Sequence, residues 1–171
     1  MSGLGPLVRN TSTLWVAAAM TDGDRAVAEL GVTEAEGFRV RLLAFDESDF
    51  EAHYDTVCNE ALWFVHHGLF DPVYEPRWPP GWTEGPWARH RAVNEAFAAA
   101  VAESAPPDSA VLIQDYHLCL MAPALRRARP DLRLVHFSHT PFAPPVWLRM
   151  LPSRARAELM AGLSATDACG F

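Results

Sequence analysis

Two short apolar runs that each end abruptly in polar residues constrain the fold of this chain more than any other feature. The first, over residues 110–115, reads A-V-L-I-Q-D, and the second, Leu132–Phe137, is followed by S-H-T-P. Apolar runs of this length are typical of buried parallel strands. The segment between them, Leu118–Arg129, is rich in helix formers and stops before Pro130, which predicts a crossover helix. The sequence therefore predicts a βαβ unit.

The order strand, helix, strand brings polar residues from both strand ends to one edge of the sheet. A right-handed crossover makes the two strands parallel and adjacent. Asp115 and His139 are therefore predicted to lie at the same carboxyl edge, where ligands bind in open α/β sheets. A structural interpretation stays open beside this one: Asp115 caps the following helix, and His139 is a half-buried imidazole with its hydrogen bonds satisfied.

The remaining segments continue the α/β pattern. With 171 residues, half of them hydrophobic, the chain can bury one sizeable core, and we predict a single domain over residues 1–171. Further strands are predicted over Thr13–Ala19, over Phe38–Phe45 and from Ala168 onward, and further helices start near Asp22 or Asp24, near Ser48, and at Arg89, Val146 and Arg154.

The charge balance and the cysteines limit the classes of partner. The chain has 14 basic and 21 acidic residues, a formal net charge of −7, and no basic run. Nucleic acid and anionic membranes are therefore not expected as partners. Three cysteines far apart in the sequence, Cys58, Cys119 and Cys169, predict reduced, buried thiols in a cytoplasmic protein. No apolar run reaches the length of a membrane span.

Seven histidines raise the question of a metal site, and their spacing argues against one. His136 and His139 form H-x-x-H, but residues three apart on a strand point to opposite faces. His66 and His67 likewise point in different directions, so one ion could not easily bind both. The other histidines lie on separate predicted elements, without a cysteine pair or an H-E-x-x-H motif. We therefore expect neither a metal nor another cofactor.

The helix predicted from about Ser48 carries two aromatic residues, Tyr54 and Trp63, nine positions apart. On an α-helix nine residues make about two and a half turns, so these side chains point to opposite sides. Both can reach one ligand only if the helix ends or bends between them. Otherwise each aromatic ring belongs to the core.

Several short motifs, taken in their order, point to a known family. They are Q-D-Y-H-L (114–118), H-F-S-H-T-P-F (136–142), L-P (151–152), G-L (162–163), the terminal D-A-C-G-F, Y-D-T-V-C-N-E-A-L-W (54–63), and the W-x6-N spacing of Trp87 and Asn94. Together they resemble the amino-terminal domain of trehalose-6-phosphate synthases, which are retaining glycosyltransferases of family 20. The resemblance covers nearly the whole chain. It implies a Rossmann-like parallel sheet with flanking helices, the amino-terminal half of a GT-B glycosyltransferase.

The resemblance also implies roles for single residues. Asp115 matches the family's aspartate that binds the acceptor sugar's hydroxyls, and His139 matches the histidine that contacts the donor sugar near the reacting centre. Tyr54 and Trp63 match a pair that helps to hold the acceptor phosphate. Gly3 stands where the family has a glycine-rich loop whose N–H groups face the donor diphosphate. The implied partners are a nucleotide-sugar donor, UDP- or GDP-glucose, and a sugar-phosphate acceptor, glucose 6-phosphate.

The chain departs from the family pattern in three places. The family's first strand and its carboxyl-terminal nucleotide-sugar domain have no counterpart here, so we expect a fragment that is inactive alone. Alanines at 17–19 occupy the region where a second tryptophan usually follows the one matching Trp15. Two alternatives therefore stay open: a sister activity, such as glucosylglycerol-phosphate synthase or a pseudo-glycosyltransferase, and a non-catalytic sugar-phosphate-binding module. The sequence leaves open the donor nucleotide, the acceptor and the oligomeric state, a homo-oligomer included.

Overall fold

The computed structural model describes residues 11–35, 37–69 and 78–171, which divide into two compact units with the boundary after Asp46. In the first unit the order along the chain is β1 (Leu14–Ala18), α2 (Asp22–Ala28), β2 (Val32–Ala35) and β3 (Phe38–Leu43). The sheet has the order β1-β3-β2, with β1 and β3 parallel and β2 antiparallel to β3. Two predicted strands and the helix after Thr21 are thus confirmed.

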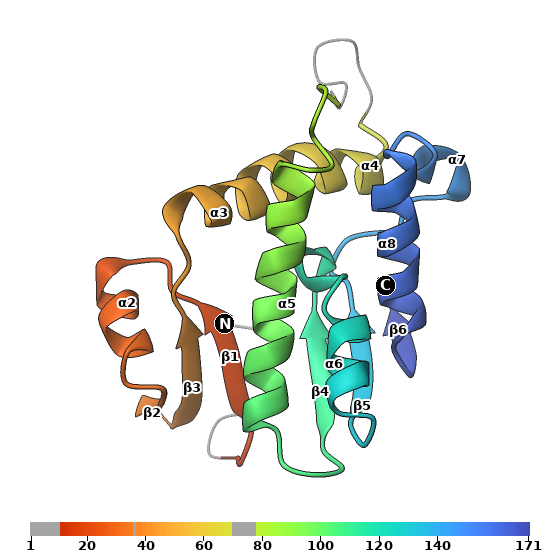
Figure 1. Cartoon of the computed structure of the whole chain (residues 1–171). Helices are drawn as coiled ribbons and strands as arrows, with labels where there is room; N and C mark the ends of the chain where they lie inside the picture. The colour runs from red at the N-terminus through yellow and green to blue at the C-terminus, as the bar shows by residue number, and fades with distance from the viewer. Residues whose placement is uncertain (1–10, 36, 70–77) are drawn as a thin grey trace. The chain divides into compact units, whose positions relative to one another are not determined.

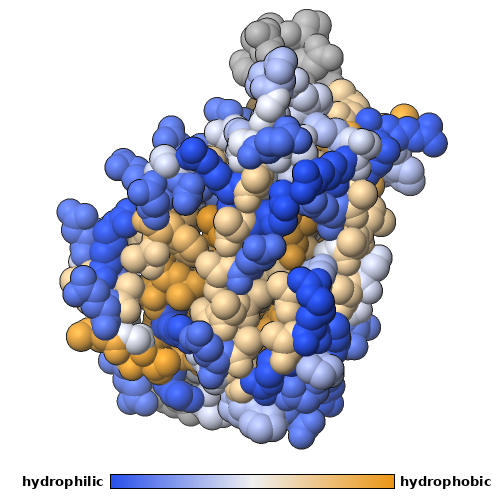
Figure 2. Space-filling view, viewed as in Figure 1, coloured by the Kyte–Doolittle hydropathy of each residue, from blue (hydrophilic) through white to orange (hydrophobic). Residues whose placement is uncertain are grey.

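Strand β2 was not predicted from the sequence. Its residues, V-T-E-A, show no clear alternation, so their pairing with β3 makes them a strand. Gly37 beside it has a φ of 80°, a left-handed conformation that favours glycine and permits the tight turn into β3. Figure 2 shows apolar surface over this unit. Among the described residues of the unit, Met20, Leu30 and Val32 are exposed.

The second unit is built on a parallel sheet of β4 (Ala110–Gln114), β5 (Arg133–Phe137) and β6 (Ala168–Gly170), in that order. The predicted βαβ unit is therefore confirmed. A 3-10 turn, η2 (Tyr116–Leu118), follows β4, so the crossover helix α6 (Ala122–Ala128) begins four residues later than predicted. Pro123 falls in the first turn of α6, where its missing N–H is tolerated.

Helices cover one face of this sheet. Figure 1 shows α5 (Pro86–Ser104), α6 and α8 (Ser153–Ser164) on one side of β4, β5 and β6. Ile113 and His136 are buried, whereas Leu112 and Phe137 on the opposite face are exposed. Short α7 (Pro145–Leu148) lies between β5 and α8 in the sequence. The strands therefore alternate between a covered face and an open one.

One continuous helical segment changes its winding twice. It comprises α3 (Glu47–Glu51), the π-helix η1 (Ala52–Leu62) and α4 (Trp63–His67), and η1 packs on α5 and η2. Gly68 ends the segment at a φ of 63°, and a side chain there would collide with the ring of Trp147. The expected helix from Ser48 is confirmed, and it does not end between Tyr54 and Trp63.

The core of the second unit draws its buried side chains from η1, α5, α8 and the segments between them. Its cysteines test the sequence prediction: Cys58 and Cys119 are buried and free, as predicted, but Cys169 is exposed because it lies on the edge strand β6. Among the residues that the structure describes, no helix combines the length and the apolar character that crossing a membrane requires. The buried apolar side chains of this core include Val57, Leu62, Val65, Trp82, Trp87, Leu120, Leu151 and Leu159.

Candidate active site

Asp115 stands where β4 ends, in a backbone conformation that almost only glycine adopts. Its φ and ψ are 66° and 165°, and holding a side chain there costs about 1 to 3 kcal/mol. Its N–H donates to the carbonyl of Phe137 (2.7 Å), which extends the pairing of β4 with β5 by one residue. Strain of this kind persists only where the surrounding structure enforces it, and it concentrates at functional sites. The conformation therefore makes Asp115 a candidate functional residue, on grounds that do not depend on any resemblance.

The two carboxylate oxygens of Asp115 have different surroundings. Oδ1 accepts hydrogen bonds from the N–H groups of Tyr116 (2.9 Å) and His139 (3.2 Å). It also accepts a longer one from the Ser138 hydroxyl (3.4 Å). Oδ2 faces Nδ1 of His117 at 3.7 Å, and 26% of the Asp115 side chain is exposed. Oδ1 thus fixes the carboxylate, and Oδ2 is the oxygen that a hydroxyl of a ligand can approach.

The charge of this carboxylate is secured by its neighbours. Burial raises the pKa of Asp115, but the His117 imidazole and the N–H groups of Tyr116 and His139 outweigh burial and lower the pKa to about 2. Asp115 is therefore ionised at neutral pH, and an ionised carboxylate only accepts hydrogen bonds. It is suited to bind sugar hydroxyls and not to deliver a proton, because an acid catalyst needs a raised pKa.

His139 lies beside Asp115, as the predicted parallel arrangement requires. Its Nε2 is 3.1 Å from Oε1 of Gln114, and its ring packs edge-on against Phe137 with 5.0 Å between ring centroids. The alternative, structural interpretation is correct in one respect, since Asp115 does cap η2. It is wrong about His139, which is exposed and not half-buried. The predicted proximity of Asp115 and His139 is confirmed.

His117 joins this site, although the sequence interpretation gave it no role. Its ring stacks on that of Tyr54 (5.5 Å between centroids, 24° between planes), so Tyr54 on η1 reaches the end of β4. Nε2 of His117 is buried and has no hydrogen-bond partner in the described part of the chain. The signal in the sequence was its position two residues after Asp115, at the same strand end. We call Asp115, His117, His139 and Tyr54 the Asp115 group.

Trp63 is not brought into the Asp115 group. Among the described residues its ring contacts Phe64 and His67, with centroids 5.5 and 4.2 Å away. Tyr54 and Trp63 are 38% and 36% exposed. The π-helix between them hydrogen-bonds each residue to the fifth one along, so nine residues come to about two whole turns and both rings turn toward a similar side. The change of winding replaces the break or bend that was expected.

Three further residues of the sequence interpretation have different outcomes. Asn94 is fully buried, accepts from the N–H of Leu120 (3.0 Å) and donates to the carbonyl of His117 (3.1 Å), so it holds the segment that follows Asp115. Trp87 is also fully buried and belongs to the core. Gly3 lies outside the described residues, and its role toward a donor diphosphate stays a prediction.

One group of described side chains has the spacing of metal ligands. It consists of His53 and Cys58 on η1 and His90 on α5, all buried. The ring centroid of His53 lies 6.4 Å from that of His117. This buried His–Cys cluster is thus adjacent to the Asp115 group but separate from it.

Comparisons with known proteins give one consistent result. The family model described as glycosyltransferase family 20 matches residues 1–171. A curated trehalose-6-phosphate synthase of Mycobacterium sp. (strain JLS) is 31% identical over 173 residues, which cover 100% of this chain and 33% of the relative. The chain therefore spans about a third of the length of the curated relatives that it matches.

Solved structures share the fold. The α,α-trehalose-phosphate synthase (UDP-forming) from Burkholderia vietnamiensis superposes with a TM-score of 0.72 at 24% identity, over 94% of this chain and 39% of that one. The N-terminal domain of a Candida albicans trehalose-6-phosphate phosphatase superposes with a TM-score of 0.75 at 25% identity, over 93% and 32% of the two chains. The predicted α/β class, a Rossmann-like parallel sheet with flanking helices as in GT-B enzymes, is confirmed.

Proposed function

Because the chain belongs to glycosyltransferase family 20, we propose that it forms the acceptor side of a retaining glucosyltransferase. The reaction is transfer of glucose from UDP- or GDP-glucose to glucose 6-phosphate, which yields trehalose 6-phosphate. The observation that carries the proposal is Asp115, an ionised carboxylate at a strand end, fixed through Oδ1 and reachable at Oδ2. The matched relatives are named trehalose-6-phosphate synthases, which supports this acceptor.

The roles of the site residues are those that the family resemblance implies, and the positions of the described residues support them. Asp115 accepts hydrogen bonds from the acceptor's hydroxyls, and His139, on the next strand end, contacts the donor sugar. Tyr54 and Trp63 hold the acceptor phosphate from η1 and α4. Each hydrogen bond to an ionised group contributes about 1.5 to 3 kcal/mol. The resemblance also assigns Gly3, which lies outside the described residues, to the donor diphosphate.

The chemistry requires no nucleophilic side chain. The acceptor hydroxyl oxygen bonds to the anomeric carbon while the bond from that carbon to the diphosphate oxygen breaks. The acceptor's proton passes to the departing diphosphate oxygen, so charge and atoms balance. The task of the protein is to orient two sugars and to exclude water, because orientation lowers the barrier and hydrolysis competes with transfer. A carboxylate that stays ionised and fixed, as Asp115 does, suits this positioning role.

The direct test is binding of glucose 6-phosphate to the 171-residue chain by titration calorimetry, with Asp115→Asn as the matched variant that keeps size and removes charge. We expect one site per chain and an affinity at least about tenfold lower in the variant. No binding, or equal affinity in the two proteins, would contradict the acceptor role. Glycerol 3-phosphate and a cyclitol phosphate serve as competing ligands, and preference for either would support a sister activity on the same scaffold.

A second candidate is a sugar-phosphate-binding module without transferase activity. One observation favours it: a solved structure with the same fold is an N-terminal domain of a protein named a phosphatase. Because the 171 residues are expected to be inactive alone, a transfer assay with UDP- and GDP-glucose separates the two candidates when this chain is joined to the remaining part of a matched relative. Binding of glucose 6-phosphate without donor-dependent product supports the module, and formation of trehalose 6-phosphate supports the enzyme.

A further inference from the structure

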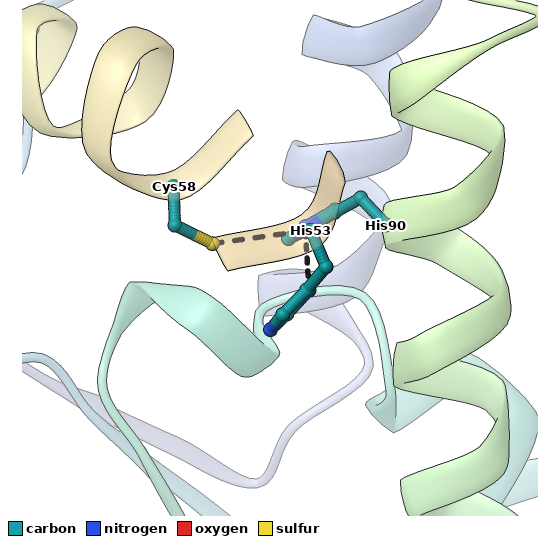
Figure 3. A group of neighbouring side chains, drawn as sticks. All are labelled: His53, Cys58 and His90. Carbon is teal, nitrogen blue, oxygen red and sulfur yellow. Dashed lines mark hydrogen bonds between the residues drawn. The ribbon is translucent and has the colours of Figure 1, made fainter. Parts of the chain in front are cut away.

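The buried His–Cys cluster brings three metal-binding side chains together in the interior of the second unit. His53 and Cys58 reach from η1 toward His90 on α5, and Figure 3 shows the three side chains converging. Nδ1 of His53 and Nδ1 of His90 are 2.9 Å apart, and Sγ of Cys58 is 3.7 Å from Nδ1 of His90. All three ligand atoms lie within 4.8 Å of one another. Exposure is 3% for His53 and 0% for the other two, so the site is dry.

The π winding of η1 creates this arrangement. Residues five apart, such as His53 and Cys58, differ by about 140° in direction around an α-helix, which has 3.6 residues per turn. In a π-helix each residue is hydrogen-bonded to the fifth one along, so the two side chains share a side. π-helical turns are rare and frequent at functional sites. The winding therefore serves to direct two ligand atoms at His90.

The chemistry of the donors indicates a soft ion. Imidazole and thiolate ligands suit copper, zinc and similar metals, and thiolate in particular favours Cu(I). His53 and His90 are both buried, and burial disfavours a charged imidazole, so each ring can offer a neutral nitrogen, the form that binds a metal. Burial raises the pKa of the Cys58 thiol, so the thiolate forms only as the ion binds, when the proton leaves to solvent.

The charge balance selects a monovalent ion. One thiolate and two neutral imidazoles cancel a single positive charge, whereas a divalent ion leaves a net charge in a site with no solvent contact, which is costly. Structural zinc almost always takes four ligands, and the described residues offer three here. Three-coordinate geometry with bonds of about 2.0 Å to nitrogen and about 2.3 Å to sulfur needs roughly 3.5 Å between nitrogens and roughly 3.7 Å from nitrogen to sulfur. The Cys58–His90 separation already matches. The two nitrogens must give up the hydrogen bond between them and separate by roughly half an ångström. Sγ of Cys58 and the His53 nitrogen, which lie within 4.8 Å of each other, must also come to roughly 3.7 Å.

We propose that His53, Cys58 and His90 form a three-coordinate site for a soft monovalent metal ion, Cu(I), which joins η1 to α5. The geometry, the burial and the charge of the donors carry this inference, and it is independent of the sugar-binding proposal. The ion would hold in place the helix that carries Tyr54, the residue next to His53. Binding involves no change of oxidation state: Cu(I) enters, three bonds form and one proton leaves.

The test is a titration of the 171-residue chain with Cu(I) under anaerobic conditions, in competition with the chelator bicinchoninate. All proteins carry Cys169→Ser, which removes the exposed thiol. We expect one ion per chain and an affinity lower by on the order of 100-fold or more in Cys58→Ser. The matched control is Cys119→Ser, because Cys119 is also buried and its Sγ lies 4.0 Å from Nε2 of His136. This control is expected to bind as the parent does.

Failure of the chain to compete with bicinchoninate overturns the proposal, and so does an unchanged affinity in Cys58→Ser. If Cys58→Ser does not fold, X-ray absorption at the copper edge on the parent chain decides, since it counts ligands without any variant. Two nitrogens and one sulfur around copper support the site, and any other ligand set refutes it. Zn²⁺ binding tighter than Cu(I) would refute the argument from charge.

Discussion

The Asp115 group and the buried His–Cys cluster are adjacent, and both contain histidines, yet they differ in every physical property. The Asp115 group is partly exposed, charged and held in a strained backbone at the ends of two strands. The buried cluster has almost no solvent exposure, and its residues lie within helices, on η1 and α5. The first can act only on a ligand that arrives from solvent. The buried cluster contributes to the packing of the interior. Substitutions in the Asp115 group should therefore change ligand binding, and substitutions in or beside the cluster should change the stability of the fold.

The largest effect is expected from the tryptophan that supports the buried cluster. Trp87 is fully buried, its ring lies 5.1 Å from that of His90, and its indole N–H donates to Glu158 (2.8 Å). Trp87→Ala should lower the free energy of unfolding by about 3 to 5 kcal/mol, measured by urea denaturation. The control is Trp63→Ala, at a ring that is 36% exposed, with a smaller expected loss. Equal losses of unfolding free energy in Trp87→Ala and Trp63→Ala would show that the region around the buried His–Cys cluster contributes no more to stability than the partly exposed Trp63 does.

The pH dependence of stability should come from the buried imidazoles and not from Asp115. His66 is buried, accepts from the N–H of Ala143 (3.2 Å), and burial together with the nearby His67 lowers its pKa to about 4. In the unfolded chain its pKa is about 6.5. Between these values the unfolded state binds more protons, so stability falls as the pH falls. We expect a loss of about 2 kcal/mol from His66 between pH 7 and pH 5, measured by urea denaturation at both.

Two control variants test whether His66 is the source of the stability loss between pH 7 and pH 5. In His66→Gln the loss between pH 7 and pH 5 should be smaller, and a loss of the same size would rule out His66 as its source. Asp115 has a lowered pKa, so the stability that it contributes is present above about pH 3.8 and is lost only toward pH 2. Asp115→Asn should therefore leave the difference between pH 7 and pH 5 unchanged.

A smaller effect, on ligand affinity, is expected at Tyr54, the aromatic residue of η1 that lies next to His53 of the buried cluster and stacks on His117 of the Asp115 group. Tyr54 stacks on His117, whereas Trp63 has no ring contact with the Asp115 group among the described residues. If the Tyr54 hydroxyl donates to the acceptor phosphate, Tyr54→Phe should weaken binding of glucose 6-phosphate by about tenfold. Affinity for glucose should not change. Calorimetry with both ligands measures this, and a larger effect in Trp63→Phe would reverse the assignment.

The smallest effect concerns the backbone of Asp115. Asp115→Gly and Asp115→Ala lose the same carboxylate, but only glycine adopts the observed conformation without strain. Relief of about 1 to 3 kcal/mol of strain, less the entropy that glycine loses on folding, leaves the Gly variant more stable by about 1 kcal/mol. Thermal unfolding of the pair measures the difference. An Ala variant as stable as the Gly variant would mean that the backbone at 115 relaxes.

Local patterns predicted the elements whose residues are neighbours in the sequence. The apolar runs ending at Gln114 and Phe137 predicted the two strands, and the parallel rule then placed Asp115 beside His139. Strand β2 escaped prediction because four residues carry too little periodicity, and its pairing with β3 decides it. The exposure of Cys169 depends on which strand lies at the sheet edge, a property of the assembled sheet.

The sequence by itself determined the α/β class, the family and the strand ends that carry the site, because these depend on short-range periodicity and on ordered motifs. Only the tertiary structure decided that Asp115 sits in a glycine-only conformation, that His117 stacks on Tyr54, and that two histidines and a cysteine converge. For the convergence of the two histidines and the cysteine, the reason is the winding of η1. Packing against α5 and η2 accompanies a π-helix that no α-helical spacing anticipates, and this winding directs His53 and Cys58 to the same side.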